Sequence, residues 1–129
     1  MVKSLILENF ILIENARISF DPGVNVLTGE TGSGKTALIA ALALISGARA
    51  DYSKIRKGCA RAFVEATFEP PPSILPLLEE AGISLEPGED LTIQRELLIT
   101  GKSRGFVANQ SASTGLLQKL APHLLNRKL

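Results

Sequence analysis

Apolar and polar residues alternate along several short segments of this 129-residue chain, a pattern typical of strands with one buried face. The alternation predicts strands over residues 5–10 and 16–20, joined by a bend. It is clearest over residues 62–69, and the prolines that follow are expected to end that strand because proline donates no hydrogen bond to a sheet. Residues 91–98 and 104–109 flank a turn-like segment and are expected to form a hairpin.

Three other segments carry helical patterns. Residues 35–46 are apolar nearly all round, which indicates a helix buried on several sides, and Gly47 stands where a helix-ending glycine is expected. Residues 73–81 predict a short surface helix. Residues 114–125 gather their leucines on one side, and Pro122 is expected to kink or break that helix because its nitrogen carries no proton.

The leucine face of residues 114–125 is expected to lack a cover, because no later segment of this sequence can pack on it. An exposed apolar patch of this kind marks an interface or promotes aggregation. We therefore expect the chain to behave poorly in solution unless a partner is supplied.

A glycine-rich segment lies between a β-branched run at residues 24–28 and the helix predicted over residues 35–46. It matches the phosphate-binding pattern G-x-x-x-x-G-K-[ST] at every position, with Gly29, Glu30, Thr31, Gly32, Ser33, Gly34, Lys35 and Thr36. The glycines let backbone N–H groups converge on phosphate oxygens, Lys35 adds a positive charge for the β- and γ-phosphates, and Thr36 offers a hydroxyl to Mg²⁺. A strand, the motif and a helix in register predict a site for ATP and Mg²⁺, against the alternative of a glycine-rich turn without a ligand.

Basic residues crowd the stretch after the predicted helix, opposed only by Asp51: Arg49, Lys54, Arg56, Lys57 and Arg61. Such a run is usually a solvated loop. It is also suited to face the phosphates of a nucleotide or of the DNA backbone. The charges alone leave both interpretations open.

Composition narrows the classes of protein to which the chain can belong. A net charge of +1 gives no overall attraction to nucleic acid, and 45% hydrophobic residues suffice for one buried core. The single cysteine, Cys59, excludes an internal disulfide and fits a reducing compartment. No signal peptide is visible, and the longest apolar run, residues 37–45, is too short to cross a membrane. We therefore expect a cytoplasmic protein without a membrane partner.

Taken together, these motifs resemble the amino-terminal head of RecN, a family of bacterial DNA-repair ATPases related to SMC proteins. The form Thr-Gly-Glu-Thr-Gly-Ser-Gly-Lys is more particular than a bare phosphate-binding loop. The similarity extends in order over about residues 1–121, through the segments at 47–51, 55–58, 62–68 and 101–109.

This resemblance implies a fold, a ligand and partners. It implies an α/β fold of the P-loop NTPase type, an SMC- or ABC-type ATPase head lobe whose mixed sheet has an N-terminal antiparallel portion and packs on the helix after the motif. It implies ATP with Mg²⁺ held by Thr36, and it places Arg56 near the nucleotide because this residue matches an arginine loop of SMC-like heads. It also implies recombinational repair of DNA double-strand breaks, with DNA bound by the full-length protein rather than by this lobe alone.

Several parts of an ABC-type ATPase are missing from residues 1–129. The sequence has no glutamine-bearing loop, signature loop, switch histidine or coiled-coil repeat, and after residue 36 no apolar run of four is followed by aspartate. We therefore expect a single incomplete head lobe that binds ATP but does not hydrolyse it alone. The remainder of the head, or a second head in a dimer, would complete the site.

Two other interpretations stay open on this evidence. A small P-loop kinase would use the same motif, but it needs a basic lid over the phosphates and a base carboxylate, and neither is recognisable. A non-catalytic remnant would keep the motif and bind nucleotide weakly or not at all.

Overall fold

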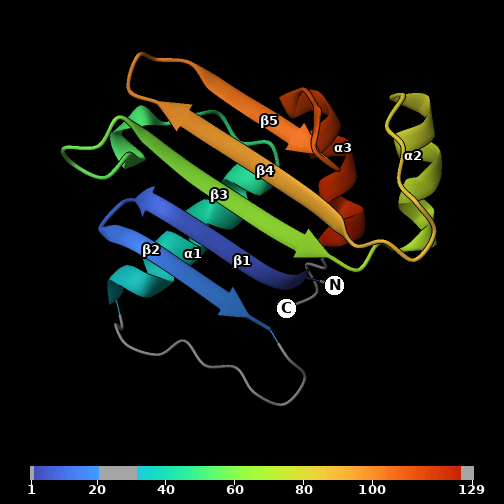
Figure 1. Ribbon diagram of the computed structural model, residues 1–129, viewed down its shortest axis with the longest axis horizontal. Coiled ribbons are helices and arrows are strands. Elements are labelled where there is room, and N and C mark those ends of the chain that lie inside the picture. Colours follow the sequence, from blue (N-terminus) through green and yellow to red (C-terminus); the bar gives the residue numbers. More distant parts are fainter. Residues whose placement is uncertain (1, 21–31, 126–129) are drawn as a thin grey trace.

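Six strands form the framework of the protein. The computed structural model describes residues 2–20 and 32–125, and of residues 32–34 it describes the backbone alone. The strands pair in one sheet in the order β2-β1-β3-β4-β5-β6 (Figure 1). Their bounds are β1 Val2–Phe10, β2 Ile13–Ser19, β3 Arg61–Phe68, β4 Leu91–Leu98, β5 Ser103–Val107 and β6 Gln110–Ser111.

Every strand pair in the described part of the chain is antiparallel. The predicted N-terminal antiparallel portion is therefore confirmed, and β1 lies inside the sheet because it pairs with both β2 and β3. The mixed sheet that the resemblance implies needs a parallel pair as well. The strand expected at residues 24–28 lies outside the described residues.

Two strand boundaries differ from the predictions, and both do so at a turn with left-handed backbone. The turn before β2 is tighter than the expected bend, because Asn9 and Ile11 adopt φ of 51° and 57°. The predicted strand at residues 104–109 ends early, because Ala108 and Asn109 have φ of 52° and 63° and turn the chain back into β6. Positive φ at both central residues, Ala108 and Asn109, is typical of a type I′ turn, whereas in the β1–β2 turn Ile11 has it and Asn9 lies within β1. Residues other than glycine seldom adopt positive φ, so alternation alone does not reveal these reversals.

The longest helices of the described chain lie on one face of the sheet (Figure 1). α1 (Gly32–Ile45) crosses behind the strands, and α3 (Thr114–Leu124) lies near β4 and β5. α2 (Leu75–Glu80) is preceded by a 3-10 turn, η2 (Pro72–Ile74), and stands beside α3. A second 3-10 turn, η1 (Tyr52–Lys54), follows α1.

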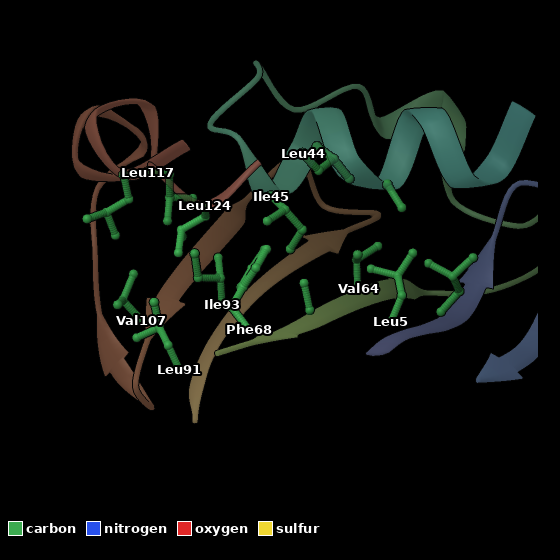
Figure 2. Close-up of a cluster of buried hydrophobic side chains, with 14 of the residues drawn as sticks. Leu5, Leu44, Ile45, Val64, Phe68, Leu91, Ile93, Val107, Leu117 and Leu124 are labelled. Atoms are coloured by element: carbon green, nitrogen blue, oxygen red, sulfur yellow. The ribbon is translucent and has the colours of Figure 1, made fainter. Parts of the chain in front are cut away.

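The core fills the space between the sheet and these helices. Leu5, Val64 and Ile93 point from the strands toward α1, and Leu117 and Leu124 point from α3 toward the sheet (Figure 2). The alternation predicted over residues 62–69 is confirmed, since the four residues of its apolar face are buried: Ala62, Val64, Ala66 and Phe68. Apolar burial of this kind is the main term that stabilises the fold.

The apolar face of α3 is covered by the rest of the described chain, so the expectation that it stays open was wrong. Leu117, Leu120 and Leu124 are only 0%, 0% and 3% exposed. Earlier segments close this face, since the three leucines join one core cluster with residues of α1 and the sheet. The sequence pattern shows which side of a helix is apolar, but it does not show which segments cover that side.

Pro122 does not break α3, so the predicted break is wrong, and the alternative that it kinks the helix stays a prediction. The helix continues to Leu124, and the N–H of Leu125 donates to the carbonyl of Ala121 at 2.8 Å. A proline removes one backbone hydrogen bond, and here it stands so near the end that little helix remains to be disturbed.

Exposed large apolar side chains lie elsewhere in the described chain: Leu12 at 75%, Ile39 at 65%, Leu75 at 49% and Ile99 at 61%. Isolated exposed residues are normal on a protein surface. Of these four residues, Ile39 is the one on α1, the helix that follows the phosphate-binding motif. None of the described helices has the length and apolar character needed to cross a membrane.

Candidate nucleotide-binding site

The second half of the phosphate-binding motif forms the beginning of α1. The helix starts at Gly32, so Ser33 and Gly34 also have helical backbone, as this class of motif requires. The predicted helix after the motif is therefore confirmed and starts earlier than expected. Residues 29–31 lie outside the described part of the chain, as does the strand expected before them.

Lys35 and Thr36 are exposed near the N-terminal end of α1. The first N–H groups of a helix have no partner inside it, and this end of a helix carries about half a positive charge. Lys35 adds to that potential, and the first turn contains no acidic residue to offset it. Such an end is unfavourable for the helix alone and favourable for a bound anion such as phosphate.

Two small residues of α1 are buried against the sheet. Ala37 and Ala41 are 0% exposed, and they let the helix lie close to the strands. On the other side, Ile39 is 65% exposed. α1 is therefore anchored along one face, with its candidate ligand-binding residues at one end and an apolar residue turned to solvent.

Arg56 lies in the segment after η1, against the end of β1. Its backbone N–H donates to the carbonyl of Asn9 at 2.8 Å, and the preceding residue, Ile55, forms an isolated bridge with Phe10. Its half-buried side chain places Nη1 3.9 Å from the Sγ of Cys59, its one side-chain hydrogen-bond partner in the described chain. The structure thus anchors the Arg56 segment, and a role of this residue at the nucleotide stays a prediction.

Asp51 organises the segment between α1 and Arg56. Its carboxylate accepts hydrogen bonds from the Ser53 hydroxyl at 2.6 Å and the Ser53 N–H at 3.1 Å, which caps η1. These bonds lower the pKa of Asp51, and the ammonium of Lys54, 3.6 Å away, lowers it further. Part of the positive charge predicted for this stretch is therefore balanced locally.

Arg61 belongs to the sheet rather than to a free basic patch. Its guanidinium pairs with Glu96 on β4 and lies 3.5 Å from Glu8 on β1. It also sits 5.0 Å from the centre of the Phe63 ring. Among the other predicted basic residues, Arg49 and Lys57 are exposed and form no ion pair within the described chain. The uncompensated charge of the stretch is thus smaller than the sequence suggested.

A hollow of about 220 Å³ lies along the flank of α1, lined on one side by Ala40 and Ala43 and on the other by Arg49, Asp51 and Lys54. Sites for drug-sized ligands usually measure about 300–1,000 Å³. The hollow is smaller than such a site, and neither of the exposed motif side chains lines it. We therefore place the candidate phosphate site at the end of α1 and not in this hollow.

Arg95 is a candidate that the sequence analysis missed. It lies on the inner face of β4 among apolar side chains and is only 1% exposed. Its Nη1 donates to the carbonyl oxygens of Leu44 at 2.8 Å and Ala48 at 3.0 Å, at the C-terminal end of α1. The signal was present in the sequence, because Arg95 occupies an apolar position of the alternation over residues 91–98.

Comparison with a family model now identifies the chain. A model described as an AAA domain matches residues 4–113. The chain belongs to the AAA domain family.

This AAA domain is also similar to RecN, as the motifs predicted. It is 32% identical to the DNA repair protein RecN of Xylella fastidiosa over 97% of this chain, and 34% identical to that of Bacillus subtilis over 98%. It is 36% identical to the Streptomyces coelicolor protein over 88% of this chain. The alignments cover 22%, 22% and 20% of those relatives, so the chain spans about a fifth of their length.

Solved structures confirm the predicted P-loop NTPase fold of the SMC head type. The AAA domain superposes with a TM-score of 0.70 on a chain from a study of ATP-driven dimerization and DNA-stimulated activation of SMC ATPases, at 18% identity, covering 93% of this chain and 76% of that one. The SMC head domain of Thermotoga maritima gives 0.66 at 23% identity, covering 92% and 41%. A RecF–ATPγS structure, of a recombination mediator protein, gives 0.65 at 19% identity, covering 91% and 29%.

Proposed function

We propose that this chain is the ATP-binding lobe of a RecN-like DNA-repair ATPase and that it binds Mg-ATP at the N-terminal end of α1. The observation that carries the proposal is the pair of exposed side chains, Lys35 and Thr36, at a helix end that has no acidic residue in its first turn. Membership of the AAA domain family and the RecN similarity support ATP as the ligand.

In this proposal each part of the motif has one role. Backbone N–H groups of residues 29–34 surround the phosphate oxygens, Lys35 neutralises charge on the β- and γ-phosphates, and the Thr36 hydroxyl holds Mg²⁺. The metal, when bound, neutralises part of the triphosphate charge. Arg56 supplies a further cation from the segment anchored at the end of β1.

We also propose that residues 1–129 form one lobe of a larger ATPase head and do not hydrolyse ATP alone. Binding phosphates and Mg²⁺ stabilises the ground state, whereas rate comes from contacts that form only in the transition state. A carboxylate that orients water and donors from an opposed head would come from the remainder of the head or from a second head. DNA would be bound by the whole assembly, in the cytoplasm. Phosphate release at about 1 s⁻¹ or faster, an ordinary enzymatic rate, by the 129-residue chain would contradict this part.

Calorimetry with Mg-ATP and two lysine variants tests the binding site. Lys35→Ala removes a charge-assisted contact worth about 1.5–3 kcal/mol, so affinity should fall by about 10- to 150-fold. Lys57→Ala removes an exposed lysine that forms no ion pair in the described chain and should leave affinity unchanged. Equal affinity for wild type and Lys35→Ala, or equal losses in both variants, would overturn the site.

A further inference from the structure

Arg95 is the one charged side chain that is buried in the described chain, at 1% exposure. Burying a cation is costly unless polar partners replace the water that it loses. Its two hydrogen bonds are therefore expected to carry a role that an apolar residue at this position of β4 would not fill.

Both bonds of Arg95 end on α1 or directly after it. Nη1 lies 2.8 Å from the carbonyl oxygen of Leu44, in the last turn, and 3.0 Å from that of Ala48, just beyond it. The last carbonyls of a helix lack partners inside it, and this end carries a partial negative charge that favours a cation. Arg95 is thus matched to the end of α1 in charge and through Nη1, whereas its Nη2 is buried without a hydrogen-bond partner among the described residues.

Gly105 is paired with Arg95 across the β4–β5 ladder. A Cβ at residue 105 would lie 3.5 Å from the Arg95 Cδ and 3.1 Å from the carbonyl oxygen of Ala112. The distance to the arginine is an ordinary van der Waals contact, so a side chain at residue 105 would crowd the backbone at Ala112 and would lie beside Arg95.

α1 packs on the sheet through apolar side chains. Ala37, Ala41, Leu44 and Ile45 are buried, and apolar contacts have no preferred direction. Hydrogen bonds depend on distance and angle and so fix a position. The two hydrogen bonds of Arg95 therefore tie the C-terminal end of α1 to β4.

The same nitrogen also restrains the segment that leads to Arg56. Ala48 begins the stretch of residues 48–56 that runs through η1 to Arg56, and the bond from Arg95 to its carbonyl ties the start of this stretch to β4. Both elements that carry candidate ATP contacts, α1 and the Arg56 segment, therefore share one anchor in the sheet.

We propose that Arg95 is a positioning residue for nucleotide binding: it fixes α1 along its axis, together with the start of the Arg56 segment, and so sets the geometry of the phosphate contacts. This inference rests on the proposed ATP site. It goes beyond it by assigning a residue outside the phosphate-binding motif that never touches the nucleotide.

Arg95→Lys and Arg95→Met test the proposal in the 129-residue chain, with Val107→Ala as a control that weakens the same core on β5 without touching α1. Both bonds come from Nη1. Lysine keeps the charge, but its ammonium ends one covalent bond short of the position of Nη1, and methionine removes both the charge and the donor. Two readouts are taken on each folded variant: Mg-ATP affinity by calorimetry, and amide hydrogen exchange at Ser46, Gly47 and Ala48, whose N–H groups close the end of α1.

We expect both Arg95 variants to lose about 10- to 100-fold in Mg-ATP affinity, the range typical when a residue that supports a metal ligand is removed. Relative to wild type, the hydrogen-exchange rate at the three amides should increase at least about tenfold more than the rate in the β1–β2 hairpin does. Val107→Ala should show no such local rise and keep its affinity within about twofold at a similar loss of stability. Methionine should have the larger effect, and Arg95→Lys decides the matter if methionine prevents folding.

Each contrary result has its own meaning. Equal losses of affinity in Val107→Ala and the Arg95 variants would reduce Arg95 to a general stabilising residue and overturn the proposal. Unchanged local exchange in Arg95→Lys would show that α1 is not anchored by this side chain, with the same consequence. If the wild-type chain binds no Mg-ATP, the proposed ATP site is wrong, and so is a role of Arg95 in positioning it. The exchange data would still decide whether Arg95 anchors α1.

Discussion

α1 and α3 lie on the same face of the sheet, yet their sequences distribute apolar residues differently (Figure 1). α3 keeps its leucines on one side, and Leu117, Leu120 and Leu124 are all buried. Its first turn is capped by Ser113, whose Oγ accepts a hydrogen bond from the Leu116 N–H at 3.2 Å. α3 therefore has the pattern of a helix that completes its packing within the described chain.

α1 is apolar nearly all round, although only one of its faces meets the sheet. Ile39 stays 65% exposed, and Lys35 and Thr36 are exposed near the N-terminal end, whose first turn contains no acidic residue. The comparison teaches that a one-sided pattern marks a structural helix. α1 carries more apolar surface than the sheet covers and has no acidic residue in its first turn, and it is the helix for which we propose a ligand.

The largest effect is expected in the core of α3. Leu120→Ala should lower the free energy of unfolding by about 2–5 kcal/mol, because Leu120 is fully buried and its removal leaves a cavity. Ile39→Ala on the exposed side of α1 should change it by about 0.5 kcal/mol or less. Urea unfolding of both variants checks the contrast. A loss for Ile39→Ala as large as that for Leu120→Ala would show that α1 and α3 do not differ as described.

A smaller effect is expected where the two helices meet. Gly47, just after α1, has φ of +94°, and a Cβ there would lie 2.7 Å from the carbonyl oxygen of Thr114 in α3. Gly82 has φ of +77° with no atom near the added Cβ, so Gly82→Ala reports the backbone cost alone, about 1–2 kcal/mol. Gly47→Ala should exceed that loss by about 1 kcal/mol or more, because the clash with the backbone of α3 is added to it.

Thermal or urea unfolding of the two glycine variants measures the difference. If Gly47→Ala and Gly82→Ala prove equally costly, the close approach of the α1 end to α3 is not energetically important. In that case the junction would be held by other contacts, such as the hydrogen bond from the Gln118 Nε2 to the carbonyl of Gly47 at 3.0 Å.

The smallest effect is expected at the cap of α3. Ser113→Ala should cost about 1 kcal/mol, because the Leu116 N–H loses its side-chain acceptor. Thr114→Ala is the matched control, since Thr114 is exposed and makes no side-chain hydrogen bond with described residues, and it should change stability by less than about 0.5 kcal/mol. Equal unfolding midpoints for Ser113→Ala and wild type would show that the Ser113 cap does not stabilise α3.

Local patterns were enough to predict most of the fold and the motif. The period of two over residues 62–69 identified the buried face of β3, and the match at residues 29–36 located the start of α1. Both signals depend on neighbours in sequence. The sharp turns at Ile11 and Ala108 escaped prediction, because their positive φ is uncommon for such residues.

What could not be predicted depends on contacts between distant segments. Arg95 stood visibly in an apolar position of its strand, but its partners lie 51 and 47 residues earlier, at Leu44 and Ala48. The cover over the leucines of α3 likewise comes from segments that no helical pattern specifies. Residue types and spacing show what needs a partner, whereas the folded chain shows which partner it finds.

The most direct test of the difference between the two helices is a titration of the nitrogen-15-labelled chain with Mg-ATP, followed through its backbone amide chemical shifts. We predict the largest shifts among described residues at Lys35, Thr36 and Ala37, at the N-terminal end of α1, with small shifts throughout α3 (Thr114–Leu124). Largest shifts in α3, or a titration that leaves the start of α1 unchanged, would contradict the assignment of α1 as the nucleotide-binding helix.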